Sequence, residues 1–190
     1  SGGLERSTRG RNVTVIFGDG AGAAVLSRSE ESGKGILSSH LHSEGKYAKE
    51  LALEGPSTSR WVPEIIAENN PDDESYYPYM NGQFVFKNAV VRFSEAIIEG
   101  LEANGLQKED INMLIPHQAN LRIAQFIQRK FQLNDDQVYN NIMNYGNTTA
   151  ASVIIALTEA WEKGKINDGD LVVLAAFGSG FTWGSVMVRW

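Results

Sequence analysis

Two stretches of the chain carry a polar residue just behind an apolar run, and this order constrains the fold more than any other feature. Residues 113–115 form an apolar run ahead of His117 in the sequence IPHQANLRI. Residues 138–143 form a less regular run ahead of Asn147 in NYGNTTAAS. A helical pattern follows each polar residue, and strands that alternate with helices are typical of an α/β fold. Both side chains are therefore predicted on loops that lead from a strand to a helix.

The rest of the chain predicts further elements in the same mixed order. Residues 54–79 are rich in Pro, Ser, Asn, Asp and aromatic residues without a sustained period, which predicts a long covering loop. A core-facing helix is predicted next, because Phe86, Val90 and Phe93 recur at helical spacing. The predicted strands are residues 12–17, 23–28, 35–42, 171–176 and 182–188, with a tight turn at 18–22, and the predicted helices are 86–101, 121–131 and 150–161.

The pair of His117 and Asn147 suits the stabilisation of an oxygen that gains negative charge. Strand-to-helix loops line one rim of an α/β sheet, so the two side chains are expected to converge there. Imidazole and carboxamide N–H groups in a dry site hold such an oxygen, and each donor is worth roughly 2.7–4 kcal/mol. From residue types alone a second interpretation stays open, with His117 as a buried structural histidine and Asn147 as a turn residue beside Gly146.

Composition narrows the function classes. The chain has 190 residues, of which 42% are hydrophobic, and this is enough for one substantial core. A net charge of −6 without a basic run argues against nucleic-acid binding. No apolar run approaches the roughly 20 residues of a membrane-spanning helix. The absence of cysteine excludes disulfides and thiolate metal sites. These features predict a cytoplasmic protein with no nucleic-acid or membrane partner.

No metal site and no cofactor are predicted. His40 and His42 are expected on one face of a strand, but no carboxylate stands in an obvious supporting position. Residues 18–23 match the G-x-G-x-x-A pattern of dinucleotide-binding loops. The pattern is discounted because residues 24–26 are expected to continue as a strand instead of opening a helix.

Four motifs together resemble one family. FGDGAGAAVL, IPHQANLRI, NYGNTTAAS and the terminal AAFGSGFTWG look like the C-terminal half of β-ketoacyl-acyl-carrier-protein synthase III, a member of the thiolase-like superfamily. The likeness runs over residues 11–190 in the family's order. It implies an α/β, thiolase-like half-fold for residues 11–190, with residues 1–10 as a linker or a cloning remnant.

The resemblance also implies a mechanism. In the family, a Cys nucleophile on the N-terminal half is acylated by an acyl-CoA, and a His and an Asn assist decarboxylative condensation with malonyl-acyl carrier protein. The His falls on His117 and the Asn on Asn147, whereas this chain has no cysteine. The backbone N–H of Ser179 falls on an oxyanion donor; its side chain is expected to be incidental, and the family more often has Gly or Ala there. The chain is expected to be half of an enzyme, inactive without the half that carries the Cys, and a homodimer when complete.

Two binding surfaces follow from the same resemblance. Gly82, Asn120 and Arg122 are expected along the pantetheine tunnel, with Phe177 beside the reacting groups. The family docks the acidic carrier protein on a basic surface, and the matching residues here are Lys87, Arg122, Arg129 and Lys130. The alternatives are an ordinary solvated helix face for these cations and a core position for Phe177.

The sequence thus predicts the C-terminal catalytic half of an acyltransferase that uses acyl-CoA as a substrate and needs no cofactor. The complete enzyme is expected to condense a short acyl-CoA with malonyl-acyl carrier protein, releasing CO2 and CoA, and so to begin fatty-acid synthesis. Two alternatives remain open. One is a secondary-metabolism synthase with another acyl donor or acceptor, and the other is a non-catalytic interaction domain.

Overall fold

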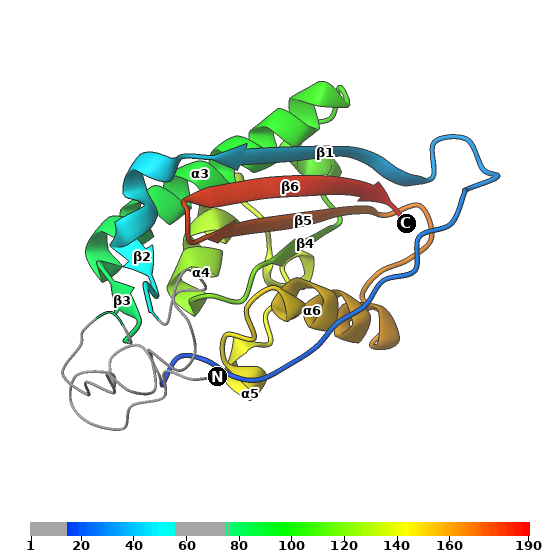
Figure 1. Cartoon of the computed structure of the whole chain (residues 1–190). Coiled ribbons are helices and arrows are strands. Elements are labelled where there is room, and N and C mark those ends of the chain that lie inside the picture. The colour runs from blue at the N-terminus through cyan, green and yellow to red at the C-terminus, as the bar shows by residue number, and fades with distance from the viewer. Residues whose placement is uncertain (1–14, 56–74, 76) are drawn as a thin grey trace.

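A four-stranded mixed sheet forms the centre of the protein. The computed structural model describes residues 15–55, 75 and 77–190. In the sheet the strand order is β1-β6-β5-β4, and β2 pairs with β3 separately (Figure 1). β4 runs parallel to β5, whereas β6 is antiparallel to both of its neighbours. The elements are β1 (Gly35–Ser43), η1 (Gly45–Glu50), β2 (Leu51–Ala52), β3 (Tyr79–Met80), α3 (Gly82–Ala103), η3 (Lys108–Asp110), β4 (Met113–Pro116), α4 (Leu121–Phe131), η4 (Asp135–Gln137), α5 (Ile142–Tyr145), α6 (Ala151–Glu162), β5 (Leu171–Gly178) and β6 (Thr182–Arg189).

Helices cover both faces of the sheet. α3 and α4 lie against one face, and α6 lies against the other (Figure 1). Along β4, Leu114 packs into the core on the side of α3, while Met113 and Ile115 pack against α6. Successive strand side chains point to opposite faces, so a continuous apolar run is buried on both. The α/β class predicted from the alternating pattern is confirmed.

The long helix α3 is held by its apolar face. Ala89, Phe93 and Ile97 recur every four residues and are almost fully buried. Burying one large apolar side chain contributes about 1.5–3 kcal/mol, so this stripe fixes the helix on the sheet. Asn81 caps the helix start by accepting the backbone N–H of Phe84. The helix predicted at 86–101 is therefore confirmed, and it begins one turn earlier.

Four of the predicted strands and the other two predicted helices are also confirmed. The strands predicted at 35–42, 113–115, 171–176 and 182–188 correspond to β1, β4, β5 and β6. The helices predicted at 121–131 and 150–161 correspond to α4 and α6. Of the predicted loop at 54–79, residues 56–74 and 76 lie outside the described residues.

The predictions for the N-terminal segment were wrong where the structure describes it. Residues 12–14 lie outside the described residues, and within 15–17 only Phe17 forms a bridge, to Asn147. Residues 23–28 form no strand, and 18–22 form no tight turn. A strand needs a hydrogen-bonded neighbour, and the described part of the chain places none beside residues 23–28, where Val25 is 96% exposed. The segment instead runs in extended form past α6 (Figure 1).

The strand predicted at 138–143 was also wrong. Val138 makes one isolated bridge to Leu114, and the chain then turns into the short helix α5. The backbone N–H of Gly146 closes that helix on the carbonyl of Ile142 at 2.8 Å. Asn147 therefore follows a helix rather than a strand, although it still precedes α6.

Candidate active site

His117 and Ser179 lie at the same edge of the sheet. Pro116 at the end of β4 is paired with Ala175 of the parallel strand β5, and the backbone N–H of His117 donates to the carbonyl of Ala175 at 2.8 Å. Ser179 follows the last residue of β5. Since the carboxyl ends of adjacent parallel strands meet at one edge, both residues project from the same rim.

The imidazole of His117 is partly buried and contacts a serine. Its Nδ1 lies 2.6 Å from Oγ of Ser152, near the start of α6. Burial lowers the pKa of His117 from 6.5 to about 4, because the charged imidazolium loses its hydration. The ring is therefore neutral at neutral pH and carries one N–H.

Asn147 is buried, and its carboxamide is oriented by the backbone. Its Oδ1 accepts the backbone N–H of Thr149 at 2.8 Å. Its own N–H donates to the carbonyl of Ile16 at 2.9 Å, and its carbonyl accepts from Gly18 at 3.0 Å. With the oxygen engaged, the amide points its Nδ2 the other way, and among the residues that the structure describes Oδ1 is the side-chain atom of Asn147 that forms a hydrogen bond. Nδ2 is thus a free donor.

A short path of contacts joins the two residues. Ser152, which touches His117, donates its backbone N–H to the carbonyl of Thr149 at 3.2 Å, and Thr149 in turn donates to Asn147. The loop at 147–149 and the first turn of α6 therefore sit beside the loop that follows β4. The two landmarks of the sequence are brought into one hydrogen-bonded cluster.

Gln118 belongs to this cluster, and sequence reasoning missed it. Its side chain is buried and fully satisfied: Nε2 donates to the carbonyls of Pro116 and Tyr139, and Oε1 accepts the backbone N–H groups of Asn141 and Ile142. It therefore ties the loop after β4 to the start of α5. A glutamine next to a candidate histidine is the only sequence signal that points to it.

The glycines of the N-terminal motif allow the backbone to approach the asparagine loop. A Cβ added to Gly18 would lie 1.9 Å from the carbonyl oxygen of Tyr145, a distance that no real side chain tolerates. Gly146 has a φ of 68° and faces the carbonyl of Ile16 from the opposite direction. This close approach requires a glycine at position 18, so the first glycine of the FGDG motif is explained without a nucleotide.

The side chain of Ser179 has a role that the sequence did not predict. Its Oγ donates to the carbonyl of Leu51 in β2 at 2.5 Å, and its carbonyl accepts from Oγ1 of Thr182 at 2.9 Å. The hydroxyl thus attaches the turn between β5 and β6 to a separate part of the fold. The expectation that this side chain is incidental was wrong.

Phe177 is a core residue in this structure. It is buried and packs against Phe181, with the ring centroids 4.9 Å apart. This matches the alternative interpretation given for it, and its contact with substrate stays a prediction.

The other predicted binding residues lie on α3 and α4, which pack against one another. Gly82 begins α3 and has open space where a Cβ would stand. Asn120 caps α4, because its Oδ1 accepts the backbone N–H of Arg122 at 2.9 Å. The cations predicted to dock the carrier protein are all exposed, and within the described ranges none of them forms an ion pair: Lys87, Arg122, Arg129 and Lys130.

One expectation about the histidines of β1 was wrong. Glu99 of α3 supports both, with Oε2 2.6 Å from Nε2 of His42 and Oε1 3.4 Å from Nδ1 of His40. The sequence did not predict this contact because His42 and Glu99 are 57 positions apart along the chain. Even so, the residues that the structure describes contain no group of three or more His, Cys, Asp or Glu that could hold a metal ion. Within that same part of the chain, no helix is long and apolar enough to cross a membrane.

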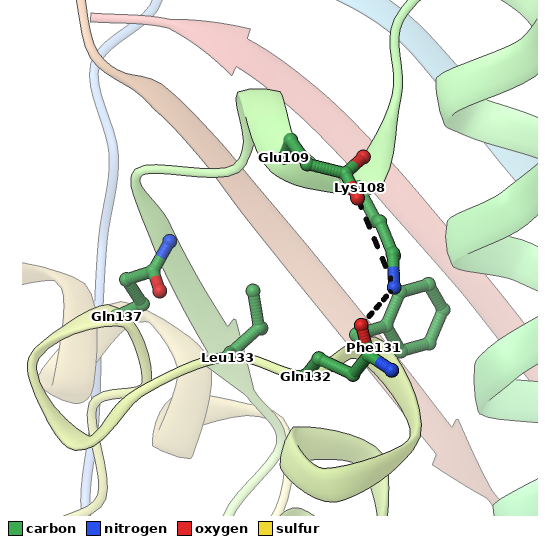
Figure 2. A pocket seen from close by; sticks show the side chains of 6 residues that line it. All are labelled: Lys108, Glu109, Phe131, Gln132, Leu133 and Gln137. Atoms are coloured by element: carbon green, nitrogen blue, oxygen red, sulfur yellow. Dashed lines mark hydrogen bonds and ion pairs between the residues drawn. The ribbon is translucent and has the colours of Figure 1, made fainter.

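A pocket of about 280 Å³ lies away from His117. Figure 2 shows Lys108 reaching toward Glu109 and Gln132 at its wall, with Leu133 and Gln137 beside them. Lys108 and Glu109 belong to η3, which precedes β4, whereas His117 follows β4. The pocket is therefore at the opposite end of that strand and contains none of the predicted site residues.

Comparison with known proteins decides the family. Residues 101–190 match the model of the 3-oxoacyl-[acyl-carrier-protein (ACP)] synthase III C terminal, and residues 2–45 match that of 3-oxoacyl-[acyl-carrier-protein (ACP)] synthase III. The β-ketoacyl-[acyl-carrier-protein] synthase III of Caldanaerobacter subterraneus subsp. tengcongensis is 47% identical over 180 residues, which cover 95% of this chain and 53% of that protein. The chain belongs to the β-ketoacyl-acyl-carrier-protein synthase III family.

Further relatives of synthase III agree with this assignment. The synthase III of Rhodospirillum centenum is 45% identical over 184 residues, covering 95% of this chain and 53% of that protein. The crystal structure of 3-oxoacyl-[acyl-carrier-protein] synthase III from Aquifex aeolicus superposes with a TM-score of 0.81 at 38% identity, covering 95% of this chain and 52% of that one. The thiolase-like fold of the synthase III C-terminal portion is thus confirmed.

The chain spans about half the length of the curated synthase III relatives it matches. The model that matches residues 2–45 covers the extended segment and all of β1, and the C-terminal model covers the end of α3 and everything after it. The proposed boundary at residue 10 stays a prediction.

Proposed function

We propose that this chain is the C-terminal catalytic half of a β-ketoacyl-acyl-carrier-protein synthase III, which condenses a short acyl-CoA with malonyl-acyl carrier protein. The observation that carries the proposal is the pair of free donors in one cluster. Asn147 has an unpartnered Nδ2, and His117 is neutral, with Nδ1 engaged by Ser152. Such a pair suits a thioester oxygen that becomes enolate-like.

In the proposed reaction, the acyl group first moves from CoA to the Cys of the N-terminal half, and CoA leaves as the thiol. The malonyl thioester then loses CO2, and the electron pair of the broken C–C bond becomes an enolate whose oxygen accepts from His117 and Asn147. The enolate carbon attacks the acyl-Cys carbonyl. The backbone N–H of Ser179, with the N–H of the Cys, holds the second oxygen until the Cys thiolate leaves.

The neutral state of His117 matters for this scheme. A charged imidazolium would form an ion pair with the malonyl carboxylate and favour the ground state over the enolate. A neutral donor holds the developing oxyanion without stabilising the charged substrate to the same extent. The lowered pKa of His117 is therefore suited to decarboxylation near neutral pH.

The proposed partners follow from the exposed cations and from the family. The acidic carrier protein would dock on Lys87, Arg122, Arg129 and Lys130, which have no ion-pair partner of their own among the described residues. Acyl-CoA would serve as a substrate, no cofactor would be needed, and the complete enzyme would be a cytoplasmic homodimer. The secondary-metabolism alternative would differ in the acyl donor or acceptor, since the same residues serve either.

The test separates the two half-reactions in the complete enzyme, in which this chain follows the half with the Cys. His117→Ala and Asn147→Ala are each expected to slow malonyl decarboxylation by about 10²–10³, while acylation of the Cys by acyl-CoA is nearly unchanged. Asn144→Ala is the matched control, because Asn144 is exposed and close in sequence to Asn147. Equal losses in both half-reactions would mean that the two residues are structural, and they would leave the non-catalytic interpretation in place.

A further inference from the structure

A second polar cluster lies behind the asparagine loop, centred on Glu159 of α6. Its Oε2 accepts from the hydroxyl of Tyr139 at 3.0 Å, from Nδ2 of Asn141 at 3.1 Å and from Nζ of Lys163 at 3.3 Å. Its Oε1 accepts from the hydroxyl of Tyr145. The side chain of Glu159 is only 18% exposed. A carboxylate at such a position is costly unless donors satisfy it, and this one has four.

The donors are not scattered over the fold. Tyr139, Asn141 and Tyr145 all belong to the segment that contains α5 and ends just before Asn147. Only Lys163, one turn beyond Glu159 at the end of α6, lies elsewhere. The carboxylate therefore fastens α5 and its flanking residues to α6.

The same helix also holds the histidine. Ser152, which contacts Nδ1 of His117, stands seven positions before Glu159, and residues two turns apart lie on one face of a helix. One face of α6 thus touches His117 at its start and the segment before Asn147 two turns later. The relative position of the two donors depends on how α6 is joined to α5.

Gln118 holds the other side of the same segment. Its Oε1 accepts the backbone N–H groups of Asn141 and Ile142 at 3.0 and 3.1 Å. Gln118 thus fixes the backbone at the start of α5, whereas Glu159 fixes its side chains at both ends. The hydrogen bond from Tyr145, together with those from Asn141 and Tyr139, lowers the pKa of Glu159 to about 2, so the carboxylate stays ionised at working pH.

We propose that Glu159 is a positioning residue that holds α5 in place. By doing so it orients the Nδ2 donor of Asn147 relative to His117. The role assigned to Asn147 rests on the proposed function. The attachment of α5 by Glu159 does not, and it is measurable in the chain without any substrate.

The first experiment measures amide hydrogen exchange in the full 190-residue chain. Glu159→Leu removes all four acceptor contacts, and Glu159→Gln keeps the shape and one acceptor oxygen. We expect exchange over residues 142–147 to rise by about tenfold in Glu159→Leu and by less in Glu159→Gln, while β5 and α3 are unchanged. The matched control is Glu162→Leu, because Glu162 lies on the same helix, is exposed and makes no contact of this kind with the described residues. Where Glu159→Leu fails to fold, the localised rise in Glu159→Gln decides.

The second experiment measures kinetics in the complete enzyme. Misplacement of a donor should lower kcat for malonyl decarboxylation by about tenfold to a hundredfold in Glu159→Leu, with KM for malonyl-acyl carrier protein and the rate of Cys acylation unchanged. Glu159→Gln should recover part of kcat. A uniform rise in exchange over the whole chain, or unchanged exchange at 142–147, would overturn the positioning role. If the unmutated complete enzyme does not decarboxylate malonyl substrates, the proposed function fails, and the exchange result still decides whether Glu159 holds α5.

Discussion

Oγ of Ser152 lies 2.6 Å from Nδ1 of His117, and this contact determines which ring nitrogen carries the proton. The same Oγ accepts the backbone N–H of Gln118 at 3.2 Å. Within the described part of the chain, Nδ1 is the only acceptor within reach of the Ser152 hydroxyl, which is buried. A network that satisfies every buried polar group therefore has Ser152 donating to Nδ1, and it leaves the proton of His117 on Nε2.

Ser152→Ala should disturb the tautomer of His117. Without the hydroxyl, Nδ1 and the N–H of Gln118 lose their partner, and the loss of a buried partner costs about 1–3 kcal/mol of unfolding free energy. The imidazole ¹⁵N shifts should report a smaller Nε2–H population, and decarboxylation should fall. Ser94→Ala is the control, since Ser94 is a buried helical serine that donates to the carbonyl of Val90. It should cost similar stability and leave the imidazole spectrum unchanged.

The pKa of His117 predicts how stability depends on pH. Its value is 6.5 in the unfolded chain and about 4 in the folded one, so the unfolded state binds more protons between these limits. Stability should be complete above pH 6.5, decline as the pH falls toward 4 and show no further loss from this group below that. The full effect is about 3 kcal/mol. In urea denaturation, the free energy of unfolding of the parent chain minus that of His117→Gln should fall by about 3 kcal/mol between pH 6.5 and pH 4. A difference that stays constant over this range would show that His117 is not buried in solution.

Short polar motifs in the sequence predicted the residues of the candidate site, but they did not predict its architecture. His117 was predicted correctly to follow a buried strand, because three consecutive apolar residues in β4 are buried on both faces. The prediction that Asn147 also follows a strand was wrong. The run 138–143 contains consecutive asparagines that break the strand pattern, and the chain turns into α5 instead. The error did not displace Asn147 from the cluster, because α6 still begins four residues after it.

The supporting residues could not be predicted, because they act across long separations. Gln118 meets the backbone of Asn141, Ser179 meets Leu51, and Glu99 meets two histidines of β1. Periodicity reports which face of an element is apolar, but it does not report which polar groups a tertiary fold brings together. The strand prediction for the N-terminal segment was wrong for a related reason, since strand propensity alone does not supply a hydrogen-bonded neighbour.

Gly18→Ala should damage the asparagine loop specifically. The new Cβ would stand 1.9 Å from the carbonyl oxygen of Tyr145, so the segment or α5 must move. Strain of this kind costs on the order of 1–3 kcal/mol, and exchange at residues 145–149 should rise. Gly45→Ala is the matched control, because among the described residues, its chain neighbours aside, no heavy atom lies within 4 Å of its Cβ position. If Gly18→Ala behaved like Gly45→Ala, the close approach would be absent in solution.

Charge reversal should test the docking surface for the carrier protein. Arg122→Glu is expected to weaken binding by about tenfold at low salt, and binding to the parent protein should fall as salt rises, because rim charges act through a screened field. Arg28→Glu provides the control, since Arg28 is also an exposed arginine that makes no ion pair among the described residues, but it lies on the extended segment instead of α4. Binding of the carrier protein is measured by titration calorimetry. If both variants weakened it equally, the cause would be the change in net charge and not the loss of a docking residue.

Ser179→Ala should separate the hydroxyl of this residue from its backbone N–H. The N–H proposed as an oxyanion donor is retained, but the bond to the carbonyl of Leu51 is lost, and one such bond contributes about 1 kcal/mol. Because Thr182 still holds the carbonyl of Ser179, the turn should loosen without unfolding. We expect a small fall in the free energy of unfolding and faster exchange at residues 178–181. In the complete enzyme, the condensation rate should fall more than the acylation rate if the donor moves, whereas unchanged exchange at the turn would mean that Leu51 does not hold it.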